Sequence, residues 1–156
     1  MLRYVNFDIV FQEIPGEVTL AVNLSNCPNR CKGCHSLYLQ EDAGETLDEK
    51  VLFAWLEKYG SAITCICFMG GDAEPHEVCR LAAFIRKESG NVKIGWYSGK
   101  DALPESISPM NFDYIKLGAY REDLGGLNVP ATNQRFYCIE NDGSIDKTDS
   151  FHKHKI

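Results

Sequence analysis

Three cysteines lie close together in the first quarter of the sequence, with the spacing C-x3-C-x2-C. Cys27, Cys31 and Cys34 stand among proline, asparagine, glycine and basic residues, a composition typical of a loop. Three thiolates can hold three irons of a cubane iron–sulfur cluster and leave the fourth iron without a protein ligand. An open metal position favours chemistry, whereas structural sites are usually closed. The spacing therefore predicts a [4Fe-4S] cluster with one reactive iron.

A zinc site is the alternative interpretation of the same cysteines. Structural zinc needs four protein ligands. His35 directly follows Cys34, so these two residues are poorly placed to share one metal. A distant cysteine such as Cys65 or Cys67 would supply the fourth ligand instead. For the cysteines outside the motif the default expectation is a buried free thiol, because their surroundings are apolar: Cys65, Cys67, Cys79 and Cys138.

Composition and charge limit the classes of protein to which the chain can belong. The 156 residues are 44% hydrophobic and 24% charged, which predicts a single globular domain over residues 1–156. A net charge of −6 argues against a nucleic-acid partner, which needs a basic patch. Without a membrane-length apolar run or a signal peptide, we expect a cytoplasmic protein with no membrane partner. The odd number of cysteines, seven, then favours metal ligation over disulfides.

The order of the predicted elements indicates an α/β fold with a largely parallel sheet. After the cysteine loop a helix is expected to begin at Thr46, because residues 46–49 form a capping box. A second helix is expected to begin at Pro75. The tail, residues 151–156, alternates in polarity and could form an edge strand. The other expected strands are residues 4–11, 18–24, 63–69, 92–97, 114–117 and 135–140.

A second motif, Gly70-Gly71-Asp72, directly follows the strand expected at residues 63–69. Glycine allows a ligand to approach the backbone closely, and the carboxylate of Asp72 favours an ammonium group. The cysteine loop likewise follows a predicted strand. Because the carboxyl ends of parallel strands meet at one edge of a sheet, we expect both motifs at that edge. Ser98 and Lys116 stand at or near predicted strand ends on the same edge.

The two motifs together resemble the radical S-adenosylmethionine superfamily. In that superfamily three cysteines bind a [4Fe-4S] cluster, and the fourth iron takes the amino and carboxylate groups of S-adenosyl-L-methionine. The resemblance implies that the cluster ligands here are Cys27, Cys31 and Cys34. It implies that the Gly70 and Gly71 backbone meets the methionine amino group, with Asp72 accepting a hydrogen bond. Further candidates for cofactor contacts are His35, Ser98 and Lys116; the pairing of His35 with Cys34 also resembles glycyl-radical activating enzymes.

The length narrows the resemblance to one family. With 156 residues the chain is similar to the anaerobic ribonucleoside-triphosphate reductase activating proteins, which are among the smallest members. Residues 118–127 and 132–137 look like that family's tail, so the resemblance covers about residues 4–140. It implies an open partial (β/α) barrel. Where the family often has Gly-Pro-Gly followed by Arg, this sequence has Ile14, Pro15, Gly16 and Glu17, which leaves the contacts of that segment open.

The implied function is activation of an anaerobic ribonucleotide reductase. The reduced cluster would cleave S-adenosylmethionine, and the resulting radical would abstract a hydrogen from a glycine of the reductase. No protein residue beyond the cluster and cofactor is expected to be catalytic, and a flavodoxin or ferredoxin would supply the electron. Two alternatives stay open: activation of another glycyl-radical enzyme such as pyruvate formate-lyase, and a non-catalytic metal-binding or electron-carrier module.

Overall fold

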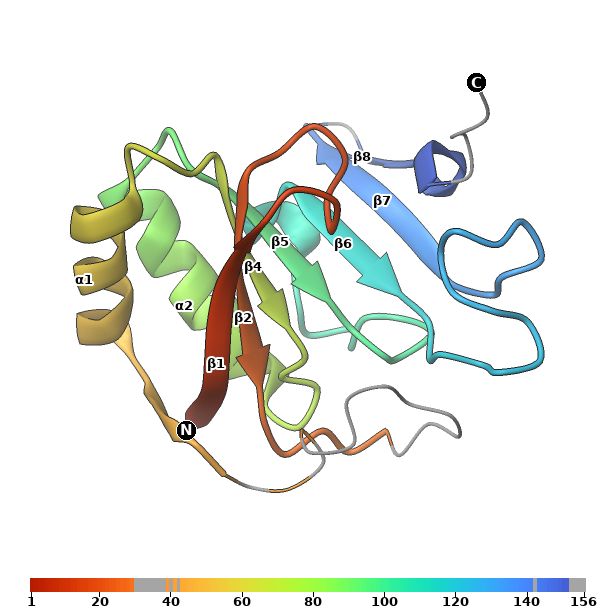
Figure 1. Cartoon of the computed structure of the whole chain (residues 1–156), viewed down its shortest axis with the longest axis horizontal. Coiled ribbons are helices and arrows are strands. Elements are labelled where there is room, and N and C mark those ends of the chain that lie inside the picture. The colour runs from red at the N-terminus through yellow and green to blue at the C-terminus, as the bar shows by residue number, and fades with distance from the viewer. Residues whose placement is uncertain (30–38, 40, 42, 142, 152–156) are drawn as a thin grey trace.

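The computed structural model describes residues 1–29, 39, 41, 43–141 and 143–151. In this described part, eight strands form one sheet in the order β3-β1-β2-β4-β5-β6-β7-β8 (Figure 1). The α/β class is confirmed, and the sheet is open, with β3 and β8 at its edges. The strands are β1 (Leu2–Val10), β2 (Thr19–Leu24), β3 (Glu45–Leu47), β4 (Cys65–Met69), β5 (Lys93–Tyr97), β6 (Tyr114–Leu117), β7 (Arg135–Glu140) and β8 (Gly143–Asp146).

Parallel pairing is confined to the centre of the sheet. The strands β2, β4, β5 and β6 run parallel, whereas the pairs β1·β2, β1·β3, β6·β7 and β7·β8 are antiparallel. The expectation of a largely parallel sheet is therefore wrong for the sheet as a whole. Antiparallel neighbours can be joined by a short turn, but a parallel pair needs a crossover of about a dozen residues or more. The α-helices lie in the crossovers from β2 to β4 and from β4 to β5, whereas the 3-10 segment η2 (Pro109–Asn111) lies in the crossover from β5 to β6.

Two α-helices within the described residues follow β3 and β4. The helix α1 (Glu49–Tyr59) begins three residues later than expected, with Asp48 as its N-cap; the Asp48 carboxylate accepts a hydrogen bond of 3.0 Å from the Val51 amide. The predicted start at Thr46 is wrong because Thr46 pairs with Arg3 in the ladder between β1 and β3. The helix α2 (Pro75–Glu88) begins at Pro75, as predicted. None of the helices in the described part is long and apolar enough to cross a membrane.

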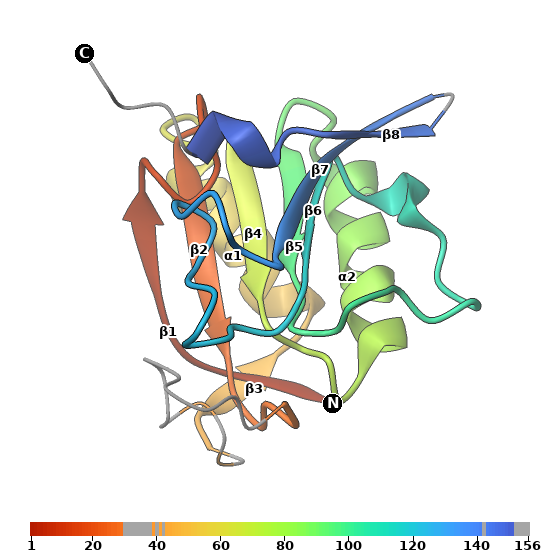
Figure 2. The ribbon, with the colours of Figure 1, turned by 90° about the vertical axis from the view of Figure 1, so that its right-hand side faces the viewer.

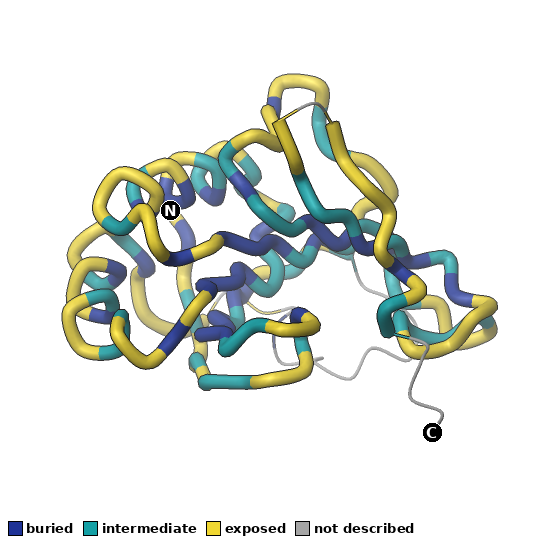
Figure 3. The backbone as a smooth tube through the Cα atoms, turned by 90° about the horizontal axis from the view of Figure 1, so that it is seen from above, coloured by how far each residue is buried: buried dark blue, intermediate teal, exposed yellow. Residues whose placement is uncertain are grey.

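The main core lies between the sheet and both helices. Alternate residues of the central strands point to this face, where they pack against Leu52 and Trp55 of α1 and the apolar stripe of α2. Figure 3 shows buried residues concentrated along the central strands. The strand residues of this core include Leu20, Val22, Ile66, Phe68, Ile94, Trp96 and Ile115.

Loops cover part of the opposite, helix-free face. Ile14 from the loop between β1 and β2 is fully buried in a small core with Cys65, Cys67 and Phe136. A Cβ atom on Gly95 would lie 2.7 Å from Ile14 Cδ1, so glycine leaves room for this loop to approach the sheet closely. In Figure 2 the loop between β6 and β7 and the 3-10 segment η3 (Thr148–Phe151) lie in front of the strands. The predicted edge strand of the tail falls mostly on residues 152–156, outside the described residues, and Phe151 belongs to η3.

Candidate functional site

The carboxyl ends of the four parallel strands lie next to one another, and this end of the sheet is here called the rim. The chain leaves β2 toward Cys27, β4 toward Gly70 and β5 toward Ser98, so segments far apart in the sequence meet there. Gly118 follows β6 at the same edge. The rim is therefore where the sequence predicted the two motifs to meet, and the described members of both lie on it.

The carboxylate of Asp72 joins three segments of the rim. Its Oδ1 accepts a hydrogen bond of 2.5 Å from Ser98 Oγ. Its Oδ2 accepts bonds of 2.8 Å from the Gly99 amide and 2.7 Å from Asn29 Nδ2. A carboxylate strengthens each such bond through its charge. The end of β4 is thereby tied to the end of β5 and to the cysteine loop after β2.

The two glycines before Asp72 give the chain a backbone path that other residues rarely adopt. Gly70 has φ +111° and Gly71 has φ +90°, both in the left-handed region. A Cβ atom on Gly71 would also lie 2.5 Å from Val78 Cγ2 of α2. The turn is fixed to β5, because Gly70 O accepts a bond of 2.7 Å from Trp96 Nε1. These constraints explain the Gly-Gly pair and place Asp72 at the rim.

Lys116 lies beside this network with its side chain buried, at 8% exposure. Its Nζ donates hydrogen bonds of 2.9 Å to Ser98 O and 3.1 Å to Gly118 O. The same ammonium lies 5.6 Å from the centre of the Tyr97 ring, within cation–π range. Lys116 therefore joins the ends of β5 and β6 and brings a positive charge to the rim. The predicted cofactor contacts of Ser98 and Lys116 remain predictions.

Cys27 is the motif cysteine among the described residues; Cys31, Cys34 and His35 lie outside them. Cys27 is half-buried, and its amide donates a bond of 2.8 Å to Leu39 O. Asn29 Nδ2 lies 3.5 Å from Cys27 Sγ and donates to it. A donor beside the sulfur suits an iron–sulfur cluster, because hydrogen bonds to the sulfurs tune such clusters. In the part of the chain that the structure describes, no three His, Cys, Asp or Glu side chains are grouped to hold a metal.

Cys65 and Cys67 lie in the small core of the helix-free face and not at the rim. Burial, followed by the nearby charge of Glu17, raises the pKa of the Cys65 thiol to about 12. Burial also raises the pKa of Cys67 well above its ordinary value. Their position in the small core, away from Cys27 at the rim, disfavours either residue as the distant zinc ligand. Both are buried free thiols, as predicted, whereas Cys79 and Cys138 are only half-buried, so the prediction of burial is wrong for these two.

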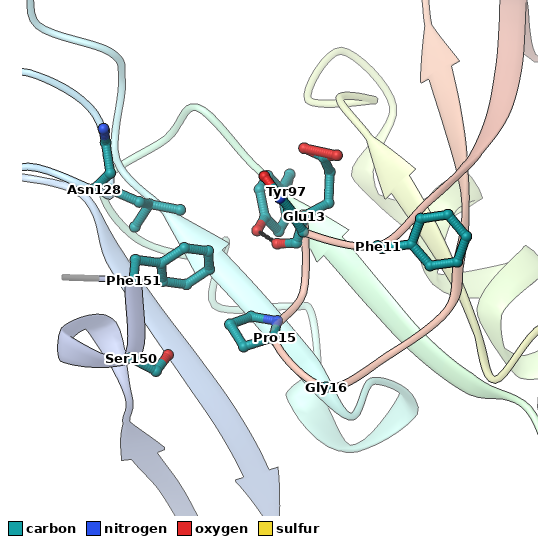
Figure 4. Close-up of a pocket in the computed structure, with 10 residues that line it drawn as sticks. Phe11, Glu13, Pro15, Gly16, Tyr97, Asn128, Ser150 and Phe151 are labelled. Atoms are coloured by element: carbon teal, nitrogen blue, oxygen red, sulfur yellow. Dashed lines mark hydrogen bonds between the residues drawn. The ribbon is translucent and has the colours of Figure 1, made fainter. Parts of the chain in front are cut away.

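A cavity of about 880 Å³ opens on the helix-free face (Figure 4). Tyr97 lies between the cavity and the rim, because it directly precedes Ser98 in the chain and also lines the cavity. Its hydroxyl donates a hydrogen bond to the backbone oxygen of Glu13, which lines the cavity as well. Burial raises the pKa of Tyr97 well above its usual 10, so its hydroxyl stays protonated. Sequence reasoning missed this cavity, because loops with no shared motif form it. Its lining is Phe11, Gln12, Glu13, Pro15, Gly16, Tyr97, Leu127, Asn128, Ser150 and Phe151.

Glu17 stands where the resembling family often has arginine, and it lies at the opposite edge of the sheet from the rim. Its carboxylate accepts a bond of 2.6 Å from Thr64 Oγ1 and one from the Tyr114 hydroxyl. Lys93 Nζ lies 3.4 Å from Glu17 Oε2. Burial alone would raise the pKa of Glu17, but these hydrogen bonds and the Lys93 charge together hold it below the ordinary 4.5. Glu17 thus has a structural role and none at the rim.

Comparison with models of known protein families, with curated proteins and with solved structures found no match to this chain. The candidate site therefore stands on its own residues and geometry.

Proposed function

We propose that this chain is a radical S-adenosylmethionine activase that generates the glycyl radical of an anaerobic ribonucleotide reductase. The observation that carries the proposal is the hydrogen bond of 2.7 Å between Asn29 of the cysteine loop and Asp72 of the Gly-Gly-Asp turn. The two motifs, which two strands and a helix separate in the sequence, thereby lie side by side. A cofactor held between a cluster and a carboxylate requires the cysteine loop and Asp72 to be this close to each other.

The roles of the residues follow from their chemistry. Cys27, Cys31 and Cys34 would hold three irons of a [4Fe-4S] cluster. When bound, the reduced cluster would supply the electron that cleaves S-adenosylmethionine, and this chemistry would serve to remove a hydrogen atom from a glycine Cα of the target protein. A carboxylate offers about four acceptor positions, and three described donors reach Asp72. Asp72 thus keeps an acceptor position for the ammonium group of the cofactor.

The open sheet supports a protein as the substrate. We propose that this open sheet corresponds to the partial barrel of this enzyme class. The cavity of about 880 Å³ beside Tyr97 would admit a glycine-bearing loop from the helix-free face. The same proposal places the protein in the cytoplasm, with a flavodoxin or ferredoxin as electron donor.

Electron paramagnetic resonance of the target tests the proposal. The chain, reconstituted anaerobically with iron and sulfide, would be reduced with S-adenosylmethionine in the presence of the reductase or of pyruvate formate-lyase. We expect a glycyl-radical doublet on the reductase alone, and none when Cys31→Ala replaces the wild type. A doublet on pyruvate formate-lyase instead would move the assignment to that target. Cofactor cleavage without a radical on either protein would contradict the activase function.

A further inference from the structure

One amide group connects a motif cysteine with the carboxylate of the second motif. Asn29 Nδ2 donates to Cys27 Sγ at 3.5 Å and to Asp72 Oδ2 at 2.7 Å. A side-chain amide nitrogen carries two hydrogens, so one NH₂ group can make both bonds. An ionised carboxylate only accepts hydrogen bonds. Asp72 therefore requires that the nitrogen of Asn29, and not its oxygen, faces the sulfur.

Gly99 keeps the space that this amide occupies. A Cβ atom on Gly99 would lie 2.5 Å from Asn29 Nδ2 and 3.0 Å from Asn29 Cγ. The backbone of Gly99 is outside the left-handed region, so glycine at this position leaves room for the Asn29 amide rather than allowing a special backbone turn. The Gly99 amide also donates to the same Asp72 oxygen, at 2.8 Å. The Asp72 carboxylate thus holds the Asn29 amide on one side, and Gly99 leaves room for it on the other side.

We propose that Asn29 is a positioning residue that sets the reduction potential of the cluster. The inference rests on the proposed function, because it requires Cys27 to be a cluster ligand. Hydrogen bonds to cluster sulfurs stabilise the extra negative charge of the reduced state and raise the potential. Asp72 has no contact with the sulfur in this network; it acts through Asn29 by holding the donor in place.

Potentiometric measurement of the reconstituted cluster without S-adenosylmethionine tests the inference, with the reduced cluster counted by electron paramagnetic resonance. In Asn29→Ala we expect the reduced-to-oxidised ratio at a fixed potential to fall about threefold to tenfold, which is roughly 30–60 mV for one electron. Gly99→Ala keeps Asn29 and every ligand but displaces the amide, so the same downward shift is expected.

The chain offers a matched control in Asn111, whose Nδ2 donates to the sulfur of Cys79, a cysteine outside the motif, at 3.0 Å. Asn111→Ala removes the same kind of bond and should leave the potential unchanged. Unchanged potentials in both Asn29→Ala and Gly99→Ala, with wild-type iron content, would overturn the inference. If Asn29→Ala fails to fold, Gly99→Ala decides alone. A wild-type protein without a four-iron cluster would instead refute the proposed function.

Discussion

At the scale of single residues, charge-assisted hydrogen bonds hold the rim together. Asp72 has three described donors from two other segments. Each of these donors would lose a charged acceptor if the carboxylate were removed. A donor that is left without a partner in a partly buried site costs free energy, because folding removes its hydrogen bond to water and supplies no protein acceptor instead.

Replacing Asp72 should therefore reduce the stability of the protein even without cofactor. For Asp72→Ala we expect the free energy of unfolding to fall by about 1–3 kcal/mol, measured by urea denaturation of the cluster-free protein. Asp101→Ala, which removes an exposed carboxylate after β5, is the control and should stay within about 0.5 kcal/mol of the wild type. An equal loss in both variants would show that the Asp72 network contributes no specific stability.

The buried thiols give a second prediction at this scale. At pH 8 a pKa of about 12 leaves roughly one Cys65 side chain in 10⁴ as the reactive thiolate. Iodoacetamide should therefore leave Cys65 and Cys67 unmodified in the folded protein and modify them in urea. Peptide mass spectrometry measures the modified fraction. Fast labelling of either residue in the folded protein would contradict the burial described for the small core.

At the scale of elements, side-chain hydrogen bonds join the parallel strands to one another at both of their ends. Asp72 and Lys116 join strand ends at the rim. Glu17 joins the start of β2 to Thr64, just before β4, and to Tyr114 of β6 at the opposite edge. The parallel strands are thus aligned by polar side chains at their ends as well as by the core that they share.

The Glu17 network should make stability depend on acid. Its pKa in the folded protein lies below the ordinary 4.5, so the ionised carboxylate stabilises the fold above pH 4.5. This contribution is lost as the pH falls through the folded pKa. We expect Glu17→Gln to lower the free energy of unfolding at pH 7 by about 1–3 kcal/mol, and the gap to the wild type to close below pH 4.5. Urea denaturation at several pH values measures this gap; a gap independent of pH would contradict the assignment.

The elements also show what the sequence could and could not predict. The buried strands and the start of α2 at Pro75 follow from apolar runs and proline placement, and their positions were predicted. The edge strand β8 was missed because all four of its residues are exposed and no apolar pattern marks it. Residues 46–49 match a capping box, but Thr46 is instead paired with β1, a contact with residues far away in the sequence. For the same reason the Asn29–Asp72 bond, across 43 positions, had no signal in the sequence.

At the scale of the whole molecule, the two faces of the sheet differ in their covering. The two α-helices cover one face, whereas loops and the 3-10 segment η3 cover part of the other, where the cavity opens. Phe11 lines this cavity, and its side chain is 68% exposed. An exposed aromatic residue beside a cavity is well placed to contact a protein substrate.

Phe11→Glu should therefore weaken radical transfer to the target. We expect the yield of glycyl radical per 5′-deoxyadenosine to fall about tenfold at limiting reductase, since central aromatic contacts of an interface often contribute more than 1 kcal/mol. Phe53→Glu is the matched control, because Phe53 is 47% exposed but lies on α1, on the other face. An unchanged yield in Phe11→Glu would exclude the cavity edge as the substrate surface.

The cysteine loop and the Gly-Gly-Asp turn are proposed to form one cofactor site. The most direct test of this proposal is chromatographic measurement of 5′-deoxyadenosine from S-adenosylmethionine with the reconstituted, reduced protein. We expect formation by the wild type, none by Cys31→Ala, and at least about a tenfold loss in Asp72→Ala at subsaturating cofactor with unchanged iron content. Absence of 5′-deoxyadenosine from an iron-loaded, reduced wild type that binds the cofactor would contradict the proposal.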